Sequence, residues 1–203
     1  MGRIVVSTNV TLDGISQDPT GEEGFEHGGW FLRISEANRA AWAQAELEEA
    51  RHAAALLLGG RSYEWFAPRW VGREGEMGEI LTALPKYVVR SRAGRSDWGP
   101  TTVIDGDLAG AVARLKGEVD GDVLVYASYE LVHALLESRL VDAVHVIVFP
   151  HALGSGGRLF QDLTRAVPLH LTGVERVGEE LVRLSYDVEP VRTEGGFLVR
   201  ADQ

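Results

Sequence analysis

The fold is decided by the stretch DVLVYASYELVHALLESRLVDAVHVIVFPHALGSGGRLF, residues 122–160. A continuous apolar run, 123–126, and a second apolar run, 144–149, flank a segment in which apolar residues recur with helical spacing. The residues that share one face of this expected helix are Leu131, Val132, Leu135 and Leu136. A strand that is apolar throughout indicates burial on both faces, which is typical of a mostly parallel α/β sheet.

The turn between the first run and the helix, Ala127-Ser128-Tyr129, is a candidate anion site. Free backbone N–H groups and the helix dipole converge at such a turn, and Ser128 is a plausible N-cap. An ordinary strand-to-helix turn that binds nothing remains the alternative interpretation.

Outward from this stretch, strands and helices alternate along the chain. We expect strands at 3–10, 55–58, 87–89, 101–104, 123–126, 144–149, 168–177 and 180–188, and helices at 35–54, 77–84, 108–116, after Gly60 and after Ser128. Ser35 and Ser62 are cap candidates, while 17–29 and 68–76 are expected to be loops. This order predicts a mostly parallel sheet with right-handed crossovers and a C-terminal antiparallel hairpin. We expect one domain, residues 1–190, and a polar tail, residues 191–203.

The composition excludes several classes of function. The chain has 203 residues, a net charge of −10 and no cysteine. An acidic surface argues against duplex nucleic acid as a partner, and disulfides or cysteine-ligated metals are impossible. No run reaches the about 18 apolar residues that span a bilayer, and MGRIVVSTNV lacks the pattern of a signal peptide. We expect a cytoplasmic protein without a membrane partner.

Three turns are expected at one edge of the sheet, because ligands of such sheets bind beyond the carboxyl ends of the strands. They are Gly59-Gly60-Arg61-Ser62, Arg90-Ser91-Arg92 and Ala127-Ser128-Tyr129. Two helix starts and three arginines suit a phosphate-rich dinucleotide, including one with an extra ribose phosphate. The spacing is not that of the G-x-G-x-x-G fingerprint. Three ordinary turns with solvated arginines remain the alternative.

Other polar residues carry weaker signals. Glu46, Glu48 and Glu49 are most simply a solvated helix face, and the six histidines form no metal-binding pattern. His145 and His151 are minor candidates for a catalytic or ligand role. We expect no metal and assign no catalytic residue.

Six features in order resemble the dihydrofolate-reductase-like superfamily, in the branch of the C-terminal reductase domain of the bifunctional riboflavin-biosynthesis deaminase/reductase. They are VTLDG (10–14), LLLGGRSYEWF (56–66), KYVVRSR (86–92), DVLVYAS (122–128), LVDAVHVIVFPHALGSGGRLF (140–160) and the closing hairpin. The resemblance covers about residues 3–188. It implies a sheet of about eight strands, NADPH as cofactor, a small-molecule substrate and often a homodimer.

Carried over by position, the resemblance also implies roles for particular residues. Gly59, Gly60, Arg61 and Ser62 hold the pyrophosphate and ribose phosphate at one helix start. Ala127, Ser128 and Tyr129 cover the pyrophosphate at the next, while Ser91 and Arg92 lie at the adenosine 2′-phosphate. The backbone of Thr8 and Asn9 faces the nicotinamide, and the loop 15–30 is a lid. Trp30, Tyr63 and Phe66 line the substrate side. Asp13 is expected to cap its own turn, or otherwise to contact substrate.

Two departures from the family bear on function. Ala127 stands where the family usually has glycine, and its methyl narrows the approach of backbone to pyrophosphate. The helix after the lid begins Ser35-Glu36-Ala37-Asn38-Arg39, in which Glu36 is a poor match for the acid that holds a pterin. The expected function is an NADPH-dependent reductase of a small pyrimidine- or pterin-like heterocycle, although not of dihydrofolate itself. The alternative is a non-catalytic nucleotide- or small-ligand-binding protein on the same fold.

Overall fold

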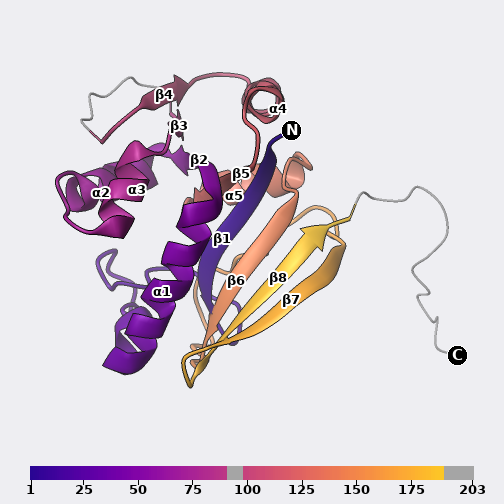
Figure 1. Ribbon diagram of the computed structural model, residues 1–203. Helices are drawn as coiled ribbons and strands as arrows, with labels where there is room; N and C mark the ends of the chain where they lie inside the picture. Colours follow the sequence, from indigo (N-terminus) through magenta and orange to yellow (C-terminus); the bar gives the residue numbers. More distant parts are fainter. Residues whose placement is uncertain (91–97, 190–203) are drawn as a thin grey trace, which may run out of the picture.

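The computed structural model describes residues 1–90 and 98–189 and contains an eight-stranded sheet with the order β4-β3-β2-β5-β1-β6-β8-β7 (Figure 1). The strands are β1 (Arg3–Thr11), β2 (Ala53–Gly59), β3 (Lys86–Val89), β4 (Thr101–Ile104), β5 (Asp122–Tyr126), β6 (Ala143–Phe149), β7 (Leu169–Val177) and β8 (Leu181–Val188). The pairs among β1 to β6 are parallel, whereas β8 pairs antiparallel with β6 and β7. The predicted parallel sheet and terminal hairpin are confirmed.

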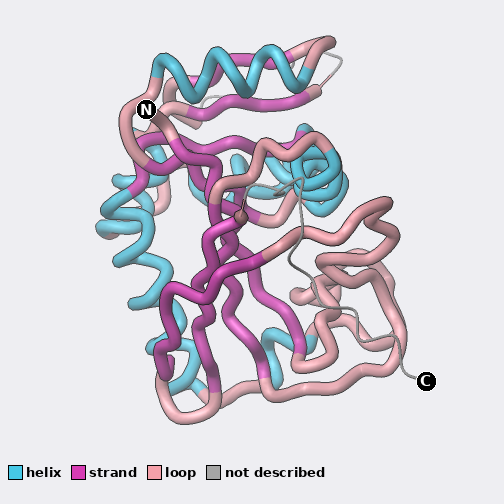
Figure 2. Tube along the Cα trace, turned by 90° about the vertical axis from the view of Figure 1, so that its right-hand side faces the viewer, coloured by secondary structure: helices cyan, strands magenta, loops and turns pink. Residues whose placement is uncertain are grey.

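Helices cover both faces of the sheet (Figure 2). They are α1 (Glu36–His52), α2 (Gly60–Trp70), α3 (Glu76–Ala83), α4 (Leu108–Glu118) and α5 (Tyr129–Glu137), and a short 3-10 helix, η1, spans Trp30–Arg33. Successive side chains of β1 alternate between the faces. Ile4 and Val6 pack with α4 and α5, whereas Val5 packs with α1, α2 and α3. Within the described residues, every helix is too short or too polar to cross a bilayer.

Helix α1 begins where the sequence predicts and ends two residues earlier. The hydroxyl of Ser35 accepts a hydrogen bond from the backbone N–H of Asn38 at 3.2 Å, so Ser35 caps the helix. Ala53 already has extended backbone angles, φ −72° and ψ 141°, and it opens β2. The predicted helix through residue 54 therefore included the start of a buried strand.

The expected loop at 68–76 is partly wrong. Helix α2 continues through Pro68 to Trp70, and α3 already begins at Glu76. Proline removes one helical donor, yet the backbone N–H of Val71 still bonds to Ala67 O at 3.0 Å. The helix therefore survives proline near its end and stops one turn later, so the loop is only residues 71–75.

The C-terminal hairpin is fastened to the start of α1. It turns at Gly178, whose φ of 64° favours glycine. The Asn38 side chain accepts from the backbone N–H of Glu179 at 2.9 Å and donates to the Glu180 carboxylate at 2.7 Å. This contact joins the start of α1 to the turn between β7 and β8. The 191–203 tail lies outside the described residues.

Candidate functional site

Two helix starts lie side by side at the carboxyl edge of the sheet. Helices α2 and α5 directly follow the neighbouring strands β2 and β5. The Ser62 hydroxyl accepts a hydrogen bond from the Ser128 backbone N–H at 3.0 Å, and the Ser128 hydroxyl accepts one from the Gly59 N–H at 3.0 Å. The two side chains thus join the turns instead of capping their own helices, which corrects the caps expected from the sequence. Neither helix has a side-chain cap, so backbone donors of both first turns remain for an anion.

Two glycines at the start of α2 lie close to neighbouring segments of the protein. A Cβ on Gly60 would lie 3.0 Å from the Arg90 Cβ, and one on Gly59 would lie 3.6 Å from the Ser128 hydroxyl oxygen. The absence of a side chain at Gly60 therefore lets the start of α2 approach Arg90 closely.

The second turn is strained. Ala127 and Ser128 have φ values of 49° and 57°, in the left-handed region. Each such residue costs about 1–2 kcal/mol unless it is glycine. Strain of this kind gathers at functional sites because the surrounding structure must hold it in place. Tyr129, the next residue, begins α5 and is 37% exposed.

The described arginines of the expected site, Arg61 and Arg90, contact different kinds of side chain. Arg61 forms an exposed ion pair with Glu130 of α5, and such pairs contribute little stability, so a ligand phosphate can displace the carboxylate at low cost. The Arg90 guanidinium lies 5.5 Å from the ring centroid of Tyr63. Ser91 and Arg92 lie outside the described residues.

Asp13 organises the turn that follows β1. Its carboxylate accepts hydrogen bonds from the Thr11 hydroxyl at 2.6 Å and from the backbone N–H groups of Leu153 at 3.1 Å and Gly154 at 2.8 Å. The hydrogen bond from Thr11 is the main reason that the Asp13 pKa falls to about 2. Asp13 thus joins its turn to the glycine-rich loop after β6.

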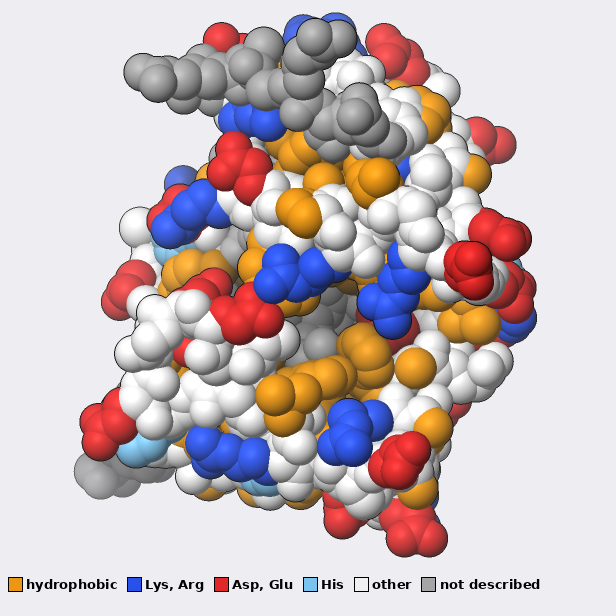
Figure 3. All heavy atoms as spheres, turned by 90° about the vertical axis from the view of Figure 1, so that its left-hand side faces the viewer, with side chains coloured by type: hydrophobic (Ala, Val, Ile, Leu, Met, Phe, Trp, Pro, Cys, Tyr) orange, Lys and Arg blue, Asp and Glu red, His pale blue; other side chains and the backbone are white. Residues whose placement is uncertain are grey.

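The loop between β1 and η1 is tied to α2 by Glu22. The Glu22 carboxylate accepts from Trp65 Nε1 at 2.8 Å and from Arg69 Nη2 at 2.6 Å. Figure 3 views the molecule from the side on which α2 lies and shows a hollow bordered by hydrophobic and cationic side chains. The Glu22 contacts hold the loop next to this side.

The aromatic residues expected on the substrate side are not gathered in one place. Trp30 is fully buried, with its Nε1 donating to Gln17 O at 2.9 Å, in the cluster beside α1 and β6. Tyr63 is buried in a different cluster with the half-buried Phe66, and its hydroxyl lies 3.1 Å from that of Thr101. Trp30 and Tyr63 therefore occupy separate apolar groups on the same face of the sheet.

Thr8 and Asn9 lie where β1 extends past β5. Strand β1 is paired with β5 only up to Ser7 but with β6 up to Thr11. On the side of β1 that faces β5, the backbone of Thr8 and Asn9 therefore lies beyond the last residue pair between these two strands. The Asn9 side chain faces α1 and accepts from Trp42 Nε1 at 3.0 Å.

A buried ionic cluster under α1 was missed by the sequence analysis. Glu49 is 9% exposed, which corrects its assignment to a solvated face. Its carboxylate accepts from Arg183 Nη2 at 2.6 Å, lies 2.7 Å from His145 Nδ1, and accepts from the Ser7 hydroxyl at 2.5 Å. A carboxylate only accepts, so Nδ1 of His145 carries the proton. Burial opposes ionisation, yet the His145 and Arg183 contacts hold the Glu49 pKa below its ordinary value.

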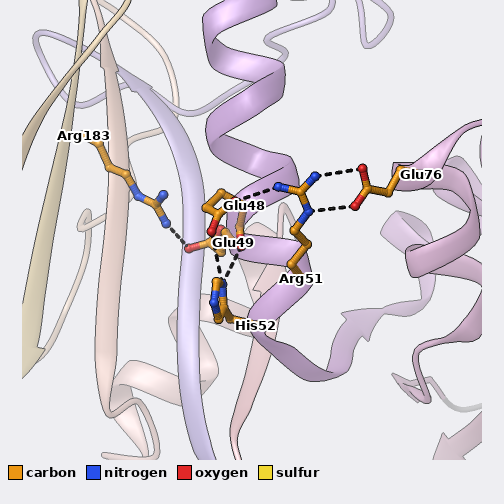
Figure 4. Close-up of polar contacts among 6 residues, drawn as sticks. All are labelled: Glu48, Glu49, Arg51, His52, Glu76 and Arg183. Carbon is orange, nitrogen blue, oxygen red and sulfur yellow. Dashed lines mark hydrogen bonds and ion pairs between the residues drawn. The ribbon is translucent and has the colours of Figure 1, made fainter.

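The other acids of α1 separate into two environments. Figure 4 shows Glu48 and Arg51 on the outer side of the helix, where Arg51 also reaches Glu76 of α3 at 2.8 Å. Glu46, in contrast, is half-buried, and burial followed by the Glu49 charge raises its pKa to about 8. Only Glu48 therefore fits the solvated face expected for all three acids. The available signal was the spacing of Trp42, Glu46 and Glu49 along one helical face.

No group of three metal-ligating side chains occurs within residues 1–90 and 98–189. His145 belongs to the ionic cluster under α1. His151 lies after β6, where its backbone N–H bonds to Phe149 O at 2.8 Å. The chemistry available at this edge of the sheet is therefore anion binding by backbone donors beside a buried acid–base cluster.

Residues 3–183 match the family model described as the RibD C-terminal domain. A curated relative, the uncharacterized protein YwjB of Bacillus subtilis, is 33% identical over 85 residues, which are 42% of this chain and 48% of that protein. The chain thus matches about half the length of this relative.

Solved structures share the fold at low identity. A putative riboflavin biosynthesis protein from Shewanella sp. PV-4 is 17% identical with a TM-score of 0.66, over 93% of this chain and 99% of that one. Dihydrofolate reductase from Enterococcus faecalis, complexed with NADP(H), is 10% identical with a TM-score of 0.53, over 93% and 97% of the two chains. The dihydrofolate-reductase-like fold expected from the sequence is confirmed.

Proposed function

Because the chain belongs to the RibD C-terminal domain family, we propose that it is a reductase that uses NADPH to reduce a small pyrimidine- or pterin-like heterocycle. The observation that carries the proposal is the pair of adjoining helix starts, 59–62 and 127–129, joined by Ser62 and Ser128. Both lack side-chain caps. Their backbone donors and helix dipoles suit the two phosphates of a dinucleotide.

The remaining parts of the cofactor have places around these turns. Arg61 reaches the ribose side after leaving Glu130, and Ser91 and Arg92 are proposed to hold the 2′-phosphate. The open backbone edge of β1 at Thr8 and Asn9 suits the carboxamide of the nicotinamide. When bound, the reduced nicotinamide supplies a hydride. The protein then orients the substrate and excludes water beneath the loop that Glu22 ties to α2.

Two further observations support a dinucleotide reductase. The family is named for a domain of a riboflavin-biosynthesis protein, and a structure with the same fold was solved with NADP(H). Trp30, Tyr63 and Phe66 are proposed to shape the substrate side, and Asp13 to hold the turn below it. The same family likeness favours a homodimer in the cytoplasm, and sedimentation of the purified protein tests the dimer.

The second candidate is a ligand-binding protein without turnover, and Ala127 favours it. Its methyl group occupies the turn where a glycine would leave more space for pyrophosphate. The Ser128 N–H is also already bonded to Ser62. Glu36 is exposed at the start of α1, so it does not provide a buried acid for a pterin.

Binding and turnover separate the two candidates. NADPH is titrated into the protein while tryptophan fluorescence and the melting temperature are followed, since five tryptophans are available as reporters. Loss of reduced-nicotinamide absorbance is then measured with pyrimidines, pterins and quinones. We expect fluorescence quenching, a thermal shift and consumption with one heterocycle. Binding without consumption supports the second candidate, and no response at millimolar NADPH refutes both dinucleotide proposals.

A further inference from the structure

The apolar core on the α1 side of the sheet is divided by polar side chains. One cluster contains Ala50 of α1 and the other packs against Trp42 and Ala45. Glu46 and Glu49 lie between these positions on the helix, and Glu49 contacts Ser7, His145 and Arg183 on the strands. Buried ionic groups cost folding free energy, and perturbed acids in such places are candidates for function.

The side chain of Tyr126 lies on the same face of the sheet as the polar side chains that separate the two apolar clusters. It is the last residue of β5 and pairs with Ser7 of β1, which puts both side chains on the α1 face. The residue is only 8% exposed, and its hydroxyl finds no hydrogen-bond partner among residues 1–90 and 98–189. Buried hydroxyls are normally satisfied, so this one is suited to a bound ligand. Its neighbour in sequence is Ala127, the first residue of the strained phosphate turn.

Glu46 lies over the same part of β1. The turns of α1 on either side of it contact β1 through Trp42 to Asn9 and through Glu49 to Ser7. Spacing of four and then three residues keeps Trp42, Glu46 and Glu49 on one helical face. Glu46 therefore lies above the segment of β1 that extends past β5. Unlike Glu49, it is half-buried, so a ligand can reach it.

We propose that Glu46 and Tyr126 act together on the reacting heteroatom of the substrate, Glu46 as the proton donor and Tyr126 as a hydrogen-bond donor. This proposal rests on the proposed reductase function and names the substrate class as a conjugated C=N or C=O compound. The nicotinamide would supply the hydride and be oxidised by two electrons. The C=N or C=O bond is reduced, because its carbon gains the hydride and its π electron pair moves to the heteroatom. The O–H bond of the Glu46 carboxylic acid breaks as an N–H or O–H bond forms. The resulting carboxylate regains a proton from water.

The charges around Glu46 keep it protonated at neutral pH. Burial and the Glu49 anion raise its pKa to about 8, and Arg183 opposes them. His145 and Arg183 both contact Glu49, so they hold that neighbour ionised. Burial and the Glu46 and Glu49 charges raise the pKa of Tyr126 well above its ordinary value, so its hydroxyl remains a donor. A neutral acid beside a neutral phenol can stabilise negative charge that develops on a heteroatom.

The first test needs neither cofactor nor substrate. Carboxyl carbon signals of the glutamates are followed by NMR across the pH range in wild type, Glu46→Gln and the control Glu48→Gln, whose acid is exposed and paired with Arg51. We expect one carboxyl to titrate near pH 8, to vanish in Glu46→Gln and to persist in Glu48→Gln. If every glutamate titrates in the ordinary acid range, the proposal is wrong.

Turnover of the heterocycle tests the roles of the two groups. We expect kcat to fall roughly 10²–10⁴-fold in Glu46→Gln and roughly 10²–10³-fold in Tyr126→Phe. The affinity for NADPH should stay unchanged in both, and Glu48→Gln should behave as wild type. In the profile of kcat against pH, the decrease at alkaline pH should be absent from Glu46→Gln. Wild-type kcat in Glu46→Gln would overturn the assignment.

A phenol probe keeps the proposal testable if the reductase function fails. The oxygen of para-nitrophenol resembles the charged heteroatom, and its colour reports its ionisation. We expect the wild type to bind it roughly tenfold more tightly than Glu46→Gln or Tyr126→Phe, the size of one lost hydrogen bond. Failure to bind NADPH refutes the proposed function alone, whereas equal phenol affinity in all variants refutes the donor pair.

Discussion

The hydroxyl of Ser62 accepts the backbone N–H of Ser128 at 3.0 Å, although 66 residues separate them in the sequence. The Ser128 hydroxyl in turn accepts the N–H of Gly59 at 3.0 Å. These two bonds hold the starts of α2 and α5 at a fixed separation. The spacing of the two candidate phosphate turns is therefore set by a pair of serine side chains.

Replacing Ser62 by alanine should loosen both turns. The Ser128 N–H then loses its acceptor in a partly buried position, which costs about 1–3 kcal/mol of unfolding free energy. Urea denaturation measures the loss, and NADPH affinity should fall with it. Ser155→Ala, at an exposed serine in the loop after β6, is the control and should change neither quantity. Equal stability of the two variants would show that the hydrogen bond to the Ser62 hydroxyl does not stabilise the fold.

Ala127→Gly should stabilise the protein. The substitution removes a left-handed alanine at φ 49°, worth about 1–2 kcal/mol, against about 0.5–1 kcal/mol of added chain entropy in the unfolded state. We expect a net gain of a few tenths to about 1 kcal/mol by these estimates and tighter binding of NADPH. Ala152→Gly, in an exposed loop with no positive φ, should lose stability instead. A loss of stability in both variants would contradict backbone strain at Ala127.

Glu46 should make the folded state less stable as the pH rises. Its pKa is about 8 in the folded protein and 4.5 ordinarily, so the folded chain binds this proton more tightly between these values. Its contribution is complete below pH 4.5 and is lost as the pH rises to about 8. Glu46→Gln should therefore gain stability relative to wild type over that window in denaturation curves. Glu48→Gln should show no such trend. A stability difference between Glu46→Gln and wild type that does not change with pH would contradict the raised pKa of Glu46.

Arg69→Ala should release the loop before η1 without unfolding the protein. Arg69 and Trp65 bind Glu22 at exposed positions, where an ion pair contributes less than about 1 kcal/mol. Amide hydrogen exchange in residues 18–29 should accelerate, with little change in melting temperature. Arg73→Ala is the matched control, because Arg73 packs over Trp70 in the same way that Arg69 packs over Trp65. Identical exchange in both variants would mean that Glu22 does not hold the loop.

Most of the fold could be predicted from the sequence because its signals are local. Mainly apolar runs such as 123–126 and 144–149 mark strands buried on both faces. Ser35 marks the start of α1, and the hairpin at Gly178 follows from alternation and turn chemistry. Helix ends were harder to predict, because Ala53 favours a helix yet opens β2, and Pro68 disfavours a helix yet lies inside α2.

The site was only partly predictable because its contacts are made between distant segments. Ser62 and Ser128 each resembled a helix cap, and only the pairing of β2 with β5 brings them together. Glu49 resembled a surface acid because its partners His145 and Arg183 lie 96 and 134 residues further along the chain. Charge partners of this kind do not appear in any local pattern.

The turns 59–62 and 127–129 are proposed to hold the phosphates of NADPH. Backbone amide signals followed by NMR during NADPH titration test this proposal most directly, because these amides are the proposed donors. We predict that the largest shifts fall on Gly60, Arg61, Ser62 and Tyr129, with saturation at one site. Unchanged amides at both turns, or shifts confined to another part of the protein, would contradict the account.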